Sequence, residues 1–161
     1  MKKNLLLLAY SLFISFSAFA QSKAGIKNNI KLDIWGDVTV NKAYLVYDED
    51  KPVPAGNQAK LNQKIYLVLE LNKSWVENTE HLVNIGGQEV ITASTGAEVL
   101  RSADLFEKLE TIKAEDAKYI KFHAVITNMT KPFPFFTVKF RVWDKNGLSE
   151  ITGSYTMKMV K

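Results

Sequence analysis

Residues 136–147 read FTVKFRVWDKNG, and this stretch decides the fold that we expect for the whole chain. Its apolar residues occur at every second position and so share one face of an extended strand: Phe136, Val138, Phe140 and Val142. Lys139 and Arg141 lie on the opposite face. The Asn146-Gly147 pair that follows is a strong hairpin signal, because both residues tolerate a positive φ. The stretch therefore predicts a strand that buries one face and turns back into an antiparallel partner.

Alternation with a period of two recurs through most of the chain after residue 29. Strands are expected at 30–35, 38–47, 63–71, 82–92, 98–101, 119–127, 135–143 and 149–160. A turn or bulge is expected at Gly86-Gly87, and a charged loop with two prolines over 48–57. Gly153 either leaves room for a large neighbour or marks a bulge. About 7–8 such strands separated by turns are typical of an all-β, antiparallel two-sheet sandwich.

Residues 102–117 depart from the strand pattern. Ser102 can cap a short helix over 103–109, since its hydroxyl can accept an amide at the exposed helix start. Residues 114–117 predict one more helical turn. We therefore expect a short helical crossover near 102–117.

The pattern of residues 136–147 resembles the penultimate strand and turn of bacterial immunoglobulin-like domains, and the resemblance extends over residues 118–160. It implies that the expected sandwich is immunoglobulin-like. It implies no function, because such domains share no common activity.

The first 20 residues have the three parts of a secretory signal peptide. Lys2 and Lys3 form a positive n-region, an apolar core covers 5–16, and Ala18-Phe19-Ala20 places small residues at positions −3 and −1. This core is shorter than the roughly 20 residues of a membrane-spanning helix, although an uncleaved anchor is the alternative. No cysteine follows it for lipid attachment. We therefore expect cleavage after Ala20 and an exported bacterial protein, periplasmic or extracellular, that is not a lipoprotein.

The expected mature chain, residues 21–161, has 141 residues and no transmembrane segment. It is long enough for a single β-sandwich domain with its own hydrophobic core. Without any cysteine, that core must supply the stability that disulfides give to many exported domains. Loss of Lys2 and Lys3 lowers the formal net charge from +4 to +2. Nucleic-acid binding needs a concentrated basic footprint, so we expect no nucleic-acid partner.

No motif in the sequence predicts catalysis, a cofactor or a metal site. His81 and His123 are far apart with no second ligand at metal spacing, and His123 is on the polar face of its strand. Neither histidine lies in a recognisable nucleophile context. The acidic run 48–50 lacks the spacing and the central glycine of a calcium-binding loop. We expect no catalytic residue, no metal and no cofactor.

Aromatic and basic side chains outside the apolar faces are the remaining candidates for a functional surface. The six candidate ligand-binding residues are Trp143, Arg141, Lys139, Phe133, Phe135 and Trp75. Exposed rings bury a large area at a small entropic cost, so they can stack on sugars or anchor a protein partner. The alternative is that such rings close the open ends of the core.

These observations favour a non-enzymatic, exported binding or assembly module of the cell envelope, with an envelope protein or a glycan as its partner. A carbohydrate-binding accessory domain is the second hypothesis, and it requires exposed, coplanar aromatic rings. An enzyme without a recognisable motif is the third, and it requires a deep pocket with perturbed titratable groups. The sequence leaves the ligand, the oligomeric state and the strand order open.

Overall fold

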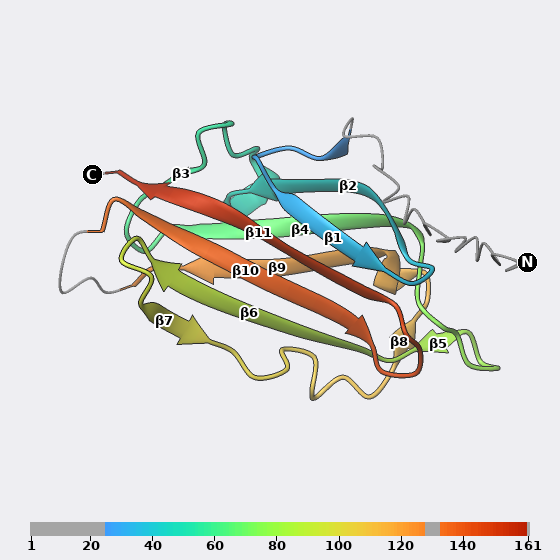
Figure 1. Ribbon diagram of the computed structural model, residues 1–161. Helices are drawn as coiled ribbons and strands as arrows, with labels where there is room; N and C mark the ends of the chain where they lie inside the picture. Colours follow the sequence, from blue (N-terminus) through green and yellow to red (C-terminus); the bar gives the residue numbers. More distant parts are fainter. Residues whose placement is uncertain (1–24, 128–132, 161) are drawn as a thin grey trace, which may run out of the picture.

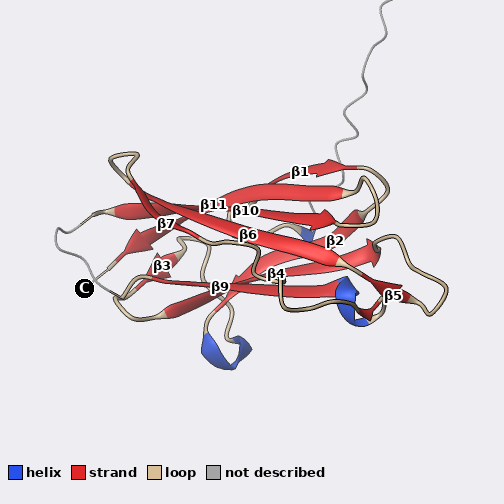
Figure 2. Ribbon diagram, turned by 90° about the horizontal axis from the view of Figure 1, so that it is seen from below, coloured by secondary structure: helices blue, strands red, loops and turns tan. Residues whose placement is uncertain are grey.

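A computed structural model describes residues 25–127 and 133–160 of the chain. The expected signal peptide, residues 1–20, lies outside the described residues. Two β-sheets pack face to face, as the two layers in Figures 1 and 2 show. The predicted all-β, two-sheet sandwich is therefore confirmed. No helix within these two ranges is long and apolar enough to cross a membrane.

The larger sheet has the strand order β1-β11-β10-β6-β7. Its strands are β1 (Lys31–Trp35), β6 (Ile85–Ala93), β7 (Glu98–Arg101), β10 (Phe135–Asp144) and β11 (Glu150–Met159). Neighbours along this order are antiparallel, and β3 (Gln58–Ala59) pairs with β11 in parallel. Strands β10 and β11 form the hairpin that Asn146-Gly147 predicted.

The smaller sheet has the antiparallel order β2-β4-β9. Its strands are β2 (Thr39–Val46), β4 (Lys64–Lys73) and β9 (Tyr119–Val125). A separate antiparallel ribbon joins β5 (Leu82–Val83) to β8 (Ile112–Lys113). Two short 3-10 turns complete the described elements: η2 (Asp48–Asp50) and η3 (Asp116–Lys118).

The hydrophobic core lies between the two sheets and follows the predicted alternation. The four apolar side chains of β10 are at most 3% exposed, and they share one cluster with Ile65, Leu67 and Leu69 of β4. Gly153 lies opposite Phe140 on β11, and a Cβ at this glycine would collide with the Phe140 ring. The register of β10 is thus confirmed, and Gly153 makes room for a large neighbour.

The turn or bulge predicted at Gly86-Gly87 is wrong. Strand β6 runs through both residues in continuous register with β10. A Cβ at Gly86 would collide with the Trp143 indole, and one at Gly87 would collide with the rings of Phe106 and Phe122. The two glycines are needed because aromatic rings approach the backbone closely, which is the other common reason for glycine within a strand.

The helix predicted over 103–109 is also wrong, because Ser102, which was expected to cap it, and Asp104 inside it both bond to β6 instead. The Ser102 hydroxyl accepts the amide of Glu89 at 2.9 Å, and Asp104 Oδ1 accepts the amide of Gly87 at 2.9 Å. Such local bonds give the backbone an alternative to the helix, and the segment follows the sheet edge as turns. The turn predicted over 114–117 is confirmed as the single 3-10 turn η3.

Glu89 is a carboxyl group inside the core. Strand β6 places it opposite Phe140, and its side chain is buried. Within the described chain, neither its Oε1 nor the hydroxyl of the buried Tyr155 has a hydrogen-bond partner. Burial raises the pKa of Glu89 to about 7, because apolar surroundings disfavour the charged form.

The Phe140→Ala substitution should lower the free energy of unfolding by about 3–5 kcal/mol, because it leaves a cavity between the sheets. The neighbouring Arg141→Ala substitution, on the solvent face, should cost no more than the roughly 1 kcal/mol of an exposed ion pair. Urea unfolding followed by circular dichroism measures both. Similar losses for the two variants would contradict the register.

The stability of the domain should depend on pH through Glu89. Between about pH 4.5 and 7 the native state holds a proton on Glu89 that the unfolded chain has released. The stability from this group therefore falls as the pH rises through that window, by about 3 kcal/mol in total. Glu89→Gln should lack this dependence, so it should gain stability relative to the wild type between pH 5 and pH 8. Urea unfolding of both proteins at the two pH values tests this, and a difference that does not change with pH would contradict it.

Candidate binding site at one end of the sandwich

Three of the six predicted site residues lie on the outer face of β10, where the alternation placed them: Lys139, Arg141 and Trp143. The Trp143 indole is partly buried against Gly86, and the Arg141 guanidinium carbon lies 4.9 Å from its ring centroid. Arg141 Nη2 also donates to Glu150 Oε2 at 2.6 Å. The indole of Trp143 is therefore covered by groups of the protein itself, while Lys139 remains exposed.

The other three predicted residues do not join this surface. Phe133 packs its ring edge-on against Phe136 with centroids 5.7 Å apart, and Phe135 is exposed at the start of β10, far from Trp143. Trp75 is buried in the core, and its Nε1 donates to the Ala117 carbonyl at 3.3 Å. Trp75 is therefore not an exposed ring: it closes one end of the core, which was the alternative for such rings, and its role in binding stays a prediction.

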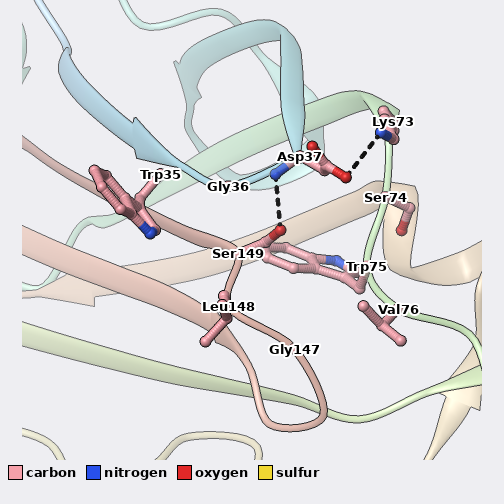
Figure 3. Close-up of a pocket in the computed structure, with 10 residues that line it drawn as sticks. All are labelled: Trp35, Gly36, Asp37, Lys73, Ser74, Trp75, Val76, Gly147, Leu148 and Ser149. Carbon is pink, nitrogen blue, oxygen red and sulfur yellow. Dashed lines mark hydrogen bonds and ion pairs between the residues drawn. The ribbon is translucent and has the colours of Figure 1, made fainter. Parts of the chain in front are cut away.

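A groove of about 670 Å³ lies at the end of the sandwich where Trp75 is buried. Three segments form it: the β1–β2 turn, the chain that leaves β4, and the β10–β11 hairpin (Figure 3). We call it the end groove, and its lining residues are Trp35, Gly36, Asp37, Lys73, Ser74, Trp75, Val76, Gly147, Leu148 and Ser149.

A buried carboxylate holds two of these segments together. Asp144 Oδ2 accepts the amide of Val76 at 2.7 Å, and Oδ1 accepts the amide of Asn146 at 2.8 Å. Gly147 lies against Asp144 and Val76. A Cβ at this position would come within 2.7 Å of Asp144 Oδ2 and of Val76 Cγ2. Asp144 thus fixes the wall at Val76 relative to the hairpin that carries Leu148.

The third segment is attached through Ser149. The Asp37 amide donates to Ser149 Oγ at 3.1 Å, as Figure 3 shows. Gly36 adopts φ +80°, which favours glycine, and a Cβ there would collide with Ser149. Glycine at this turn therefore lets β1 end beside the hairpin and brings Trp35 to the groove.

The lining is mostly apolar, and its charges balance. Asp37 and Lys73 are its two charged residues, and they form an ion pair of 3.3 Å at the rim. The indole of Trp35 and the side chain of Leu148 project at the left of Figure 3, while Val76 lies at the right. The lining holds no histidine, and the Ser149 hydroxyl accepts a backbone amide. This set of groups can bind an apolar ligand, but it offers no nucleophile with a base beside it.

Trp35, Val76 and Leu148 were not among the predicted site residues, although a signal for two of them is present in the sequence. Trp35 precedes the turn at Gly36-Asp37, and Leu148 follows the turn at Asn146-Gly147. A large apolar residue beside a tight turn has few neighbours that can cover it. The groove also needs residues 73–76 beside these turns, and the hydrogen bond from the Val76 amide to Asp144 that holds them there cannot be predicted from the sequence pattern.

Comparison with known proteins identifies the fold but no family. No protein-family model matches the sequence, and no match is found among curated proteins. The fold is similar to the crystal structure of the C-terminal domain of Wzt, with a TM-score of 0.55 and 10% sequence identity over 85% of this chain and 81% of that one. A weaker similarity, with a TM-score of 0.44 and 14% identity, covers 79% of this chain and 31% of the Pseudomonas fluorescens alkylpurine DNA glycosylase AlkC bound to DNA containing an abasic site analog. The first similarity supports the β-sandwich fold, and the second is too low to support an argument.

The Asp144→Ala substitution should loosen the end groove, because it leaves two partly buried amides without their acceptor. We expect the free energy of unfolding to fall by about 1–3 kcal/mol and the amide of Val76 to exchange with solvent faster. Leu148→Ala in the same hairpin is the control, because its exposed side chain should change stability by about 0.5 kcal/mol at most. Hydrogen exchange with residue resolution measures this. Unchanged protection of Val76 in Asp144→Ala would show that the carboxylate does not fix the wall.

Proposed function

We propose that this protein is an exported, non-enzymatic binding module of the cell envelope that docks onto a partner protein through the end groove. One observation carries the proposal. Among the large apolar side chains of the described residues, the two most exposed are Leu148 at 86% and Trp35 at 71%, and both line this groove. Val76, half exposed, lines it as well.

Single exposed apolar residues are common on proteins, but a contiguous set of them marks an interaction site. Covering one such side chain completely is worth about 1.5–3 kcal/mol. Tryptophan is also among the residues that most often dominate the energy of a protein interface. The Asp37–Lys73 pair at the rim matches the usual arrangement of an apolar centre with a polar border. We expect the partner to insert one or two apolar side chains between Trp35 and Val76.

A protein partner fits this groove better than a glycan does. Leu148 and Val76 are aliphatic, so they give no hydrogen bonds to sugar hydroxyls. A sugar in the end groove would need exposed rings on which to stack, whereas Trp75 is buried and the nearby Trp143 is partly covered by Arg141 and Gly86. The groove is open, and its lining offers no nucleophile with a base beside it, which supports a binding role over an enzymatic one. The proposal of export rests on the signal-peptide pattern of residues 1–20.

Photocrosslinking in the cells that express the chain tests this proposal. With Leu148→p-benzoylphenylalanine we expect one discrete protein adduct in the envelope fraction. The same substitution at Leu100, an equally apolar and half-exposed position on β7 away from the groove, is the matched control and should give no adduct. Trp35→Ala in the crosslinking chain should abolish the adduct and leave the melting curve unchanged.

The affinity of the purified pair gives the second measurement. Trp35→Ala should weaken binding of the crosslinked partner by about tenfold or more. Tyr119→Ala, which removes an exposed aromatic ring from the other sheet, should have no effect. The proposal would be wrong if position 148 gave no adduct, or if positions 148 and 100 gave the same adduct.

A further inference from the structure

The outer face of the smaller sheet carries a second cluster of aromatic and charged side chains, which the end groove does not use. We call it the tyrosine face, and its residues are Tyr44, Tyr66, Glu70, Tyr119, Lys121 and His123. Strand register brings them together from three strands. Glu70 lies opposite Tyr119, Tyr66 lies opposite His123, and Val68 lies between Tyr44 and Lys121.

Val68 shows that these side chains form a closed layer. It points to the outer side of β4, yet it has no exposed surface. Its neighbours on the adjacent strands, Tyr44 and Lys121, must therefore cover it. An ordinary solvated strand face would leave a valine at this position in contact with water. The tyrosine face is thus a packed surface of rings and charges, with its apolar base already covered.

Hydrogen bonds hold the rings in place. The Tyr44 hydroxyl donates to Glu70 Oε1 at 2.9 Å, and the Tyr66 hydroxyl donates to Asp48 Oδ1 at 3.0 Å. Burial, together with the bond to Glu70, keeps the pKa of Tyr44 well above its usual value, so this hydroxyl stays a donor. The exposed His123 ring in turn lies against Tyr66, with centroids 5.8 Å apart, and a ring supported in this way loses little entropy when a ligand covers it.

Two lysines of this surface, Lys42 and Lys121, are paired with carboxylates. Lys42 Nζ lies 2.8 Å from Glu70 Oε2, and its hydrogen bond holds the pKa of Glu70 below its usual range. Lys121 Nζ lies 2.7 Å from Asp50 Oδ1 and 4.5 Å from the Tyr66 ring centroid. Lys64, on the same face of β4, is exposed and adds a third cation, but Asp48, Asp50 and Glu70 balance the three lysines, so the surface has no excess positive charge to attract a polyanion such as nucleic acid or an acidic polysaccharide.

From these contacts we infer that the tyrosine face is a binding site for a neutral glycan. A sugar ring presents C–H groups on its faces and hydroxyls at its edge. Tyr119, 48% exposed, and the exposed His123 offer flat ring surfaces on which the C–H groups of the sugar can stack. The Glu70 carboxylate and the Lys42 and Lys121 ammonium groups can form charge-assisted hydrogen bonds with the sugar hydroxyls. A protein partner is less well served, because the face has no exposed aliphatic anchor comparable to Leu148.

This inference is independent of the proposed function, since the end groove contains none of these residues. The two sites also lie on different parts of the sandwich: the end groove joins the β1–β2 turn to the β10–β11 hairpin, while the tyrosine face is the outer surface of β2, β4 and β9.

The test is binding of residues 21–161 to a printed array of neutral, amino and acidic glycans, followed by titration calorimetry with the soluble oligosaccharide that binds best. We expect a neutral glycan to bind. Tyr119→Ala and Tyr66→Ala should each raise its Kd by about tenfold or more, in proportion to the ring surface removed. Tyr119→Phe should retain binding, because stacking needs the ring and not the hydroxyl.

Controls separate the two sites and separate binding from folding. Trp35→Ala in the end groove and Thr137→Ala on the outer face of the larger sheet should leave the Kd unchanged. Melting curves check that each variant is folded, and the exposed Tyr119 should tolerate replacement even if Tyr66 does not. The inference is overturned if no glycan binds, if acidic glycans alone bind, or if Tyr119→Ala binds as well as the wild type. Loss of glycan binding in Trp35→Ala would instead place the sugar in the end groove and overturn both proposals.

Discussion

The register of β10 is the constraint on which the rest of the structure depends. This strand lies in the middle of the larger sheet between β11 and β6, and a slip of one residue would turn all its side chains to the opposite face. The observed register buries Phe140 between the sheets and leaves Lys139 and Arg141 in solvent. It also brings Asp144 to the start of the hairpin, where the carboxylate binds the Val76 amide. The alternation of inward and outward side chains along β10 therefore places both the core residue Phe140 and the carboxylate that fixes the wall of the end groove.

Two asparagines connect the sheets at the edge far from the β10–β11 hairpin. Asn28 and Asn57 both adopt a positive φ, at 57° and 47°, and both are buried. Asn28 Oδ1 accepts the amide of Leu45 on β2, and Asn57 Nδ2 donates to the Thr156 carbonyl on β11. The pair is joined by a 3.1 Å bond from Asn28 Nδ2 to Asn57 Oδ1. Apolar packing between sheets has no direction, so these bonds supply part of the alignment that the core alone cannot.

The sequence predicts the sandwich and its core well because both depend on alternation, which is local. Phe140 and Leu67 could be assigned to the inside without knowing which strands are neighbours. Features that depend on contacts between distant residues could not be predicted. Ser102 has the chemistry of a helix cap, and only the proximity of β6 turns its hydroxyl toward Glu89. For Trp75, which follows a strand, the sequence left open whether the ring binds a partner or closes the core, and only the contact of its Nε1 with Ala117 shows that it is buried. His123 lies beside Tyr66 only because β9 pairs with β4, and Asp50 reaches the same surface only through its ion pair with Lys121.

The two proposed sites would bind through different interactions: exposed apolar side chains in the end groove, and aromatic rings with paired charges on the tyrosine face. Trp35 and Leu148 contribute little to folding because they stay exposed, so the free energy of covering them is released only when a partner arrives. On the tyrosine face, Tyr44, Tyr66 and Lys121 already have partners within the protein. A ligand there gains from contact with fixed rings and from sharing charges that are already in place, so its binding disturbs no buried bond. Neither site requires the core to rearrange, and Asp144 and Glu70, which fix the respective side chains, belong to different sheets. Under the two proposals, occupation of one site would leave the other free to bind.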